Sequence, residues 1–143
     1  MAKVKNPART KKAEKQTQAS SGLMSAGERV VVCAREASRF KALDIVVLDV
    51  SGYSSFSDYF VICTGKSGRQ IQGIADNLEA GLKQQGLRPL GVEGKREGQW
   101  VLMDYGDVII HLFYEPVRRF YDLESLWSEA AQVEWDDPAV GGR

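Results

Sequence analysis

The segment Thr64-Gly65-Lys66-Ser67 has residues that many nucleotide-binding proteins use to hold phosphate. In a phosphate-binding loop, another glycine stands five residues before the glycine of Gly-Lys-Ser, and the backbone N–H groups between them cradle the phosphates. Here that position is Phe60, inside an apolar run typical of a strand. The motif is therefore incomplete. We interpret Ser67 as the start of a helix, because Gln70 follows it at the spacing of a capping box.

Carboxylates are the second group that could do chemistry, because nucleotidyl transfer uses paired aspartates or glutamates to hold Mg²⁺ on a phosphate. Asp44 and Asp49 are five residues apart in a predicted strand, so their side chains point to opposite faces. Asp104 and Asp107 flank a predicted turn and could converge, but the sequence places no third carboxylate with them. We expect Asp107 to favour the turn and Asp104 to end a strand, without a metal site.

His111 is the only histidine, and it stands among apolar residues of a predicted strand. A single histidine cannot form a site with several histidine ligands. As a catalytic base it would need a nucleophile and an orienting partner, and the sequence identifies neither. We predict a hydrogen-bonded structural or interface histidine, and no catalytic residues.

Aromatic side chains close to arginines form the last candidate group. They are Trp100, Tyr105, Phe113, Tyr114, Arg118, Arg119, Phe120 and Tyr121. Tryptophan, tyrosine and arginine are frequent anchors of protein interfaces, and their density here exceeds what a core needs. We therefore predict a protein-binding surface. Single-stranded RNA binding by stacking on the aromatic rings is the alternative, although the middle of the chain is slightly acidic.

Charge is unevenly distributed along the 143 residues, whose formal net charge is +0. Residues 1–24 contain six lysine or arginine side chains and one glutamate, a net charge of +5 without hydrophobic periodicity. Residues 128–143 contain four carboxylates and one arginine, a net charge of −3. We predict a disordered basic tail over residues 1–24, a single domain over residues 25–127, and a disordered acidic tail over residues 128–143.

Cysteine usage and hydropathy bear on the compartment. Cys33 and Cys63 stand inside a predicted helix and a predicted strand, which indicates buried free thiols and a reducing compartment. No apolar run reaches the roughly 18 residues that a membrane-spanning helix needs. We therefore expect a cytoplasmic protein that does not bind a membrane.

Hydrophobic periodicity predicts three helices and five strands. The helices run from Ser25 to about Phe40, from Ser67 to about Gln85, and from Pro116 to Trp127; the strands are Asp44–Val50, Tyr59–Cys63, Arg88–Glu93 and the two runs of the hairpin Trp100–Tyr114. Pro89 favours an edge position for the third strand. The order α-β-β-α-β-β-β-α predicts an α/β domain of three layers, with a mixed sheet of about five strands flanked by helices.

Four long blocks in this order resemble the ribosomal silencing factor family, also called the Iojap-like family. They are DIVVLDVSGYSSFSDYFVICTGKSGRQIQGIADNLE, GLRPLGVEG, WVLMDYGDVIIHLF and RRFYDLESLW. The resemblance covers about Ser25 to Trp127. It implies a nucleotidyltransferase-like fold without the catalytic motif, and a protein that is not an enzyme and needs no cofactor or metal.

The resemblance also implies a function. Similar proteins bind ribosomal protein fourteen of the large subunit, block joining of the two subunits, and lower translation when nutrients are short. By matching position, the expected partner-binding residues are Trp100, Met103, Asp104, Tyr105, Arg118 and Tyr121. Members of the family tend to be homodimers when free, and the basic tail could contact ribosomal RNA. A nucleotidyltransferase-like enzyme and an RNA-binding module remain the alternatives.

Overall fold

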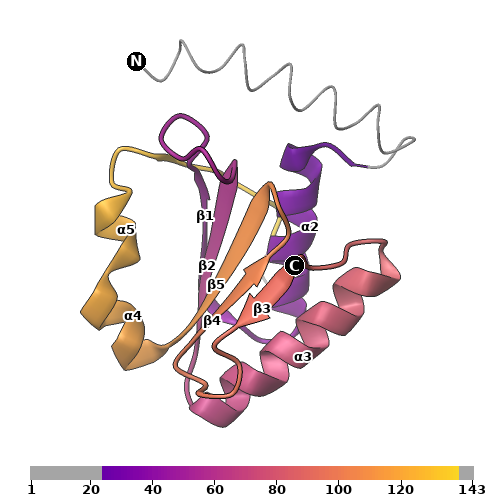
Figure 1. The fold of residues 1–143 in the computed structure, drawn as a ribbon, viewed down its shortest axis with the longest axis vertical. Helices are drawn as coiled ribbons and strands as arrows, with labels where there is room; N and C mark the ends of the chain where they lie inside the picture. Colours follow the sequence, from indigo (N-terminus) through magenta and orange to yellow (C-terminus); the bar gives the residue numbers. More distant parts are fainter. Residues whose placement is uncertain (1–23, 139–143) are drawn as a thin grey trace.

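The computed structural model describes residues 24–138, which form three layers. Figure 1 shows helices α2 (Ala26–Arg39) and α3 (Gly68–Gln84) on one face of a sheet, and helices α4 (Glu115–Tyr121) and α5 (Leu123–Leu126) on the other. The predicted three-layer α/β class with a mixed sheet is therefore confirmed. Within the described residues, no helix is long and apolar enough to cross a membrane.

The described residues form a sheet of six strands in the order β3-β4-β5-β2-β1-β6. Their bounds are β1 Leu43–Asp49, β2 Tyr59–Gly65, β3 Gly91–Glu93, β4 Trp100–Asp104, β5 Val108–Tyr114 and β6 Ala131–Gln132. The central pair, β2 and β5, is parallel, and every other pair is antiparallel. The predicted hairpin joins β4 and β5, and the short β3 lies at an edge, as Pro89 indicated.

Local sequence explains why the two long helices begin where they do. The side chain of Ser25 accepts a hydrogen bond from the N–H of Glu28, and Glu28 accepts one from Ser25, which completes the predicted capping box of α2. The Ser67 side chain caps α3 by accepting from the N–H of Gln70. The apolar residues that give both helices their hydrophobic periodicity are buried against the sheet.

The apolar side chains form one cluster on each face of the sheet. The larger cluster lies under α2 and α3 and contains alternate residues of β4 and β5, with Val101, Met103, Ile110 and Leu112 fully buried. The smaller cluster lies under α4 and α5 and includes Phe113. Both cysteines are buried and free, and burial raises the pKa of each thiol to about 12, so both stay protonated.

The C-terminal part of the chain differs from the prediction. Residues 128–138 do not form a disordered tail: β6 pairs with β1, and the N–H of Val133 donates to the carbonyl of Val47 at 2.8 Å. The physical reason is that Val133 and Trp135 alternate with polar residues and pack against the larger cluster. Residues 1–23 and 139–143, which include nearly all of the predicted basic tail, lie outside the described residues.

Two other predictions need correction. The predicted helix over Pro116–Trp127 is divided into α4 and α5 at Asp122, whose φ of 48° is a left-handed conformation that aspartate tolerates. The predicted strand Asp44–Val50 is observed one residue earlier, as Leu43–Asp49, and its first two residues, Leu43 and Asp44, are exposed.

Candidate functional site

The segment Thr64-Gly65-Lys66-Ser67 serves helix packing and capping in the structure. A Cβ at position 65 would lie 2.6 Å from Cδ1 of Ile71, so a larger residue would require the buried Ile71 side chain to move. The N–H of Lys66 donates to Oε1 of Gln70 at 2.6 Å, and the N–H of Gln70 donates to Ser67. Two backbone donors that an anion would use are therefore already bonded.

The candidate carboxylates are also engaged within the fold. Oδ1 of Asp104 accepts a hydrogen bond from the N–H of Gly106 at 2.8 Å, which holds the turn of the hairpin. Asp107 is buried and forms an ion pair with Arg29, whose Nε lies 3.3 Å from Oδ2. Among residues 24–138, no group of three histidine, cysteine, aspartate or glutamate side chains is placed to hold a metal ion.

Within the described residues, the sheet is only partly covered on the side of α4 and α5. Helix α4 contacts β5 and β2, whereas α3 contacts β4 from the opposite side. Side chains of β3 and β4 that point away from α3 therefore stay partly exposed. We call this surface the open face, and it consists of Glu93, Trp100, Leu102, Asp104, Ile109 and Tyr121.

Strand register fixes how the open face is built. Glu93 of β3, Leu102 of β4 and His111 of β5 form one row across three strands. Asp104 and Ile109 form part of the next row, and Gly91 adds no side chain to it. An apolar strip of Trp100, Leu102 and Ile109 is thus bordered by the carboxylates of Glu93 and Asp104. Glu93, Gly94, Trp100 and Leu102 line a shallow hollow of about 280 Å³.

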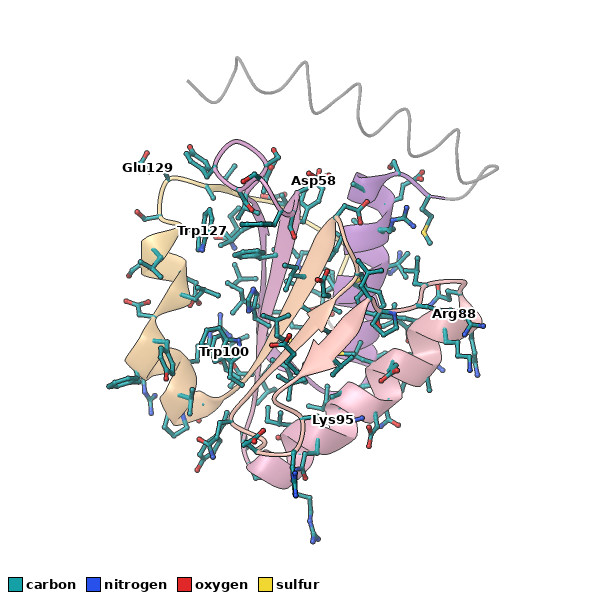
Figure 2. All side chains as sticks on the ribbon, in the orientation of Figure 1. Asp58, Arg88, Lys95, Trp100, Trp127 and Glu129 are labelled. Atoms are coloured by element: carbon teal, nitrogen blue, oxygen red, sulfur yellow. The ribbon has the colours of Figure 1, made fainter. Side chains whose placement is uncertain are left out.

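Trp100 is held between the sheet and α4, as Figure 2 shows. Its ring centroid lies 4.7 Å from that of Phe113 and 5.1 Å from that of Tyr121. Its Nε1–H donates to Nδ1 of His111 at 3.1 Å. The neighbouring Phe120 is 80% exposed and packs edge-on against Tyr121. An aromatic series therefore extends from the core to the surface of α4.

His111 is buried and accepts a hydrogen bond, which agrees with the prediction of a hydrogen-bonded structural histidine. Its ring packs edge-on against Phe60 at 4.6 Å and accepts the hydrogen bond from Trp100. Burial lowers the pKa of His111 from 6.5 to about 4, because the charged form would be desolvated. His111 is therefore neutral at pH 7.

This pKa predicts a loss of stability in acid. The folded pKa is lower than the unfolded one, so the unfolded chain binds a proton first as the pH falls. The contribution of His111 is full above about pH 6.5, and it should decline by up to about 3 kcal/mol by about pH 4. Chemical unfolding of the wild type and of His111→Phe at pH 7 and pH 4.5 measures it. We expect the wild type to lose more stability than the variant, and equal losses would contradict the assignment.

Met103 and Tyr105 require a correction as expected partner contacts. Met103 is fully buried and Tyr105 is 8% exposed, and both belong to the cluster under α2 and α3. Strand alternation points them away from Trp100 and Asp104, so as placed they stabilise the core. Burial also raises the pKa of the Tyr105 hydroxyl.

Of the two candidates on α4, only Tyr121 is available to a partner. Tyr121 is 52% exposed beside Trp100. The Arg118 side chain is only 12% exposed, and its guanidinium donates to Glu124, to Thr64 and to the carbonyl of Asp44. Arg118 therefore ties α4 to α5 and to the sheet, which corrects its expected role as a surface contact.

The sequence-based list of site residues omitted Leu102, Glu93 and Ile109. Leu102 shares a face with Trp100 by simple alternation, so the sequence contained the signal. Glu93 and Ile109 join the open face through strand pairing, which depends on the register of β3 and β5.

Comparisons with known proteins agree on one family. A family model described as ribosomal silencing factor during starvation matches residues 24–141. A Bacillus subtilis protein named ribosomal silencing factor RsfS is 41% identical over 96 residues, which are 67% of this chain and 81% of that protein. A mouse protein named mitochondrial assembly of ribosomal large subunit protein 1 is 34% identical over 90 residues, 61% of this chain and 40% of that protein.

A solved structure has the same fold. The crystal structure of a Chromobacterium violaceum protein superposes with a TM-score of 0.71 at 31% identity, and the match covers 84% of this chain and all of that one. The match of the family model spans more than half of the sequence. This chain belongs to the ribosomal silencing factor family.

Proposed function

We propose that this protein binds ribosomal protein fourteen of the large ribosomal subunit through the open face. The bound protein occupies the surface that the small subunit needs, so the subunits do not join and translation falls under nutrient limitation. The action is steric, and no bond is made or broken.

The observation that carries this proposal is an apolar strip, bordered by carboxylates, that residues 24–138 leave partly exposed. Trp100, Leu102 and Ile109 are partly exposed along the strip, and Glu93 and Asp104 border it. A ribosomal protein needs cationic side chains to bind ribosomal RNA. The part of its surface that faces away from the RNA is then complementary in charge to an apolar strip bordered by carboxylates. The family and the name of the mouse relative support the large subunit as the partner.

The surface is sufficient for a regulatory affinity. A dissociation constant of about 1 μM corresponds to roughly −8 kcal/mol, and a few aromatic or aliphatic anchors supply most of the energy in many interfaces. Trp100 and Tyr121 are the aromatic anchors on this face, and Leu102 is an aliphatic one.

Sedimentation of separated ribosomal subunits tests the proposal. We expect the protein to sediment with the large subunit, not with the small one. When both subunits are then mixed in magnesium, the share of joined ribosomes should fall as the protein concentration rises. Joining that proceeds normally with the large subunit saturated by the protein would overturn the steric mechanism.

We propose two further partners. A second copy of the chain could cover the same apolar strip in the absence of ribosomes, which a concentration-dependent mass in analytical ultracentrifugation would reveal.

The +5 charge of residues 1–24 suggests an added contact with ribosomal RNA. Removing residues 1–23 should then reduce the salt dependence of large-subunit binding, and an unchanged salt dependence would contradict the contact.

A further inference from the structure

We infer that His111 is a positioning residue that fixes the indole of Trp100 in its binding orientation on the open face. This inference rests on the proposed function. His111 itself is buried, so its effect on a partner is exerted through Trp100.

The two residues form a diagonal pair across β4 and β5. Trp100 lies directly opposite Phe113, and His111 lies opposite Leu102. Diagonal neighbours in an antiparallel pair are within reach of aromatic side chains. The donor edge of the indole therefore meets the ring of His111, with Nε1 and Nδ1 3.1 Å apart.

Packing alone would fix the orientation of this indole less strongly than packing together with the hydrogen bond does. The torsion that turns an aromatic ring about its Cβ–Cγ bond is broad and roughly two-fold, so rings can adopt more than one orientation. The rings of Phe113 and Tyr121 are tilted by 31° and 48° to the indole, and such contacts do not select which edge of the indole faces His111. A directed hydrogen bond to Nδ1 selects one orientation, because the other would leave the indole N–H without this acceptor.

The state of the His111 ring supports an acceptor role. Because Nδ1 accepts, the neutral ring carries its proton on Nε2. Nε2 is buried and has no hydrogen-bond partner among the described residues. A purely apolar ring would avoid that unsatisfied donor, so packing alone favours phenylalanine at this position. What imidazole adds there is the acceptor for Trp100.

Two substitutions at position 111 separate positioning from packing. His111→Phe keeps an aromatic ring and removes the acceptor. His111→Asn leaves a smaller side chain, with an amide oxygen close to the place of Nδ1. If His111 served only packing, both stability and binding should be better retained with phenylalanine. If it positions Trp100, the order for binding is reversed.

We expect His111→Phe to remain as stable as the wild type or nearly so, and to bind the large subunit about tenfold more weakly. His111→Asn should be less stable, yet bind more tightly than His111→Phe at a temperature where both are folded. Thermal unfolding and sedimentation of the same samples give both quantities. Wild-type affinity in His111→Phe, or binding that follows stability across the two variants, would overturn the inference.

A second measurement is independent of the ribosome. Nitrogen-15 NMR resolves the indole N–H signals of Trp100, Trp127 and Trp135, and Trp100→Phe identifies the first by its loss. His111→Phe should shift the Trp100 signal and speed its exchange with water, while the signal of Trp135, which packs on the cluster of the opposite face, stays in place. An unchanged Trp100 signal would refute the hydrogen bond. If the wild type fails to bind large subunits but this shift is observed, the proposed function fails and the orientation of Trp100 by His111 stands.

Discussion

Replacing Leu102 with lysine is expected to weaken large-subunit binding by at least about 30-fold and to leave the domain folded. Leu102 lies opposite Glu93 of the edge strand β3. Opposite charges directly across two antiparallel strands stabilise a sheet slightly, so the free protein tolerates the lysine. In the complex, an ammonium group would be desolvated in an apolar contact and would face a basic partner. Sedimentation with large subunits and thermal unfolding measure the two effects.

Phe56→Lys is the matched control for this experiment. Phe56 is an apolar residue that is 84% exposed in the loop between β1 and β2, so the substitution adds the same charge. That loop precedes Tyr59, which pairs with Val108 at the far end of β5 from the Trp100–Phe113 pair. The affinity of the Phe56→Lys variant for the large subunit should stay within about twofold of the wild type. A folded Leu102→Lys protein that binds as Phe56→Lys does would move the partner contact away from the open face.

The elements with a strong hydrophobic period could be predicted from the sequence. The stripe of Val30, Cys33, Ala34 and Ala37 in α2 is buried, and the hairpin around Gly106 joins β4 and β5. The short β6 could not be predicted, because two residues carry too little pattern and the strand exists only by pairing with Leu48 and Asp49. Long-range pairing decided that element.

The site was predicted only in part, for a related reason. Residues Trp100 to Tyr105 are apolar on both faces of the strand, so alternation separates the faces without telling which one is covered. Helix placement decides it: α3 covers Met103, whereas α4 packs on Trp100 through Tyr121 and leaves Leu102 partly exposed. The site residues inferred from the family resemblance were matched by position alone, so they came from both faces of the strand.

Among the ion pairs of residues 24–138, the one between Arg29 and Asp107 should have the largest effect on stability. The side chains of Arg29 and Asp107 are 17% and 3% exposed, and the pair links α2 to the turn that begins β5. The backbone carbonyl of Asp107 also accepts from the N–H groups of Asp58 and Tyr59, so the turn fixes the start of β2 as well. Removing the cation leaves a buried carboxylate without its charge partner.

Arg29→Met is therefore expected to lower the free energy of unfolding by about 3–5 kcal/mol. Adding Asp107→Asn should restore part of this loss, because it removes the uncompensated charge, and the two single variants should be clearly non-additive. Arg119→Met is the control. The side chains of Arg119 and Glu115 are 73% and 50% exposed, and loss of their ion pair should lower the free energy of unfolding by less than about 1 kcal/mol. Chemical unfolding of the four variants and the wild type measures the cycle. A loss below about 1 kcal/mol for Arg29→Met, or additive effects, would show that this ion pair contributes little to the stability of the fold.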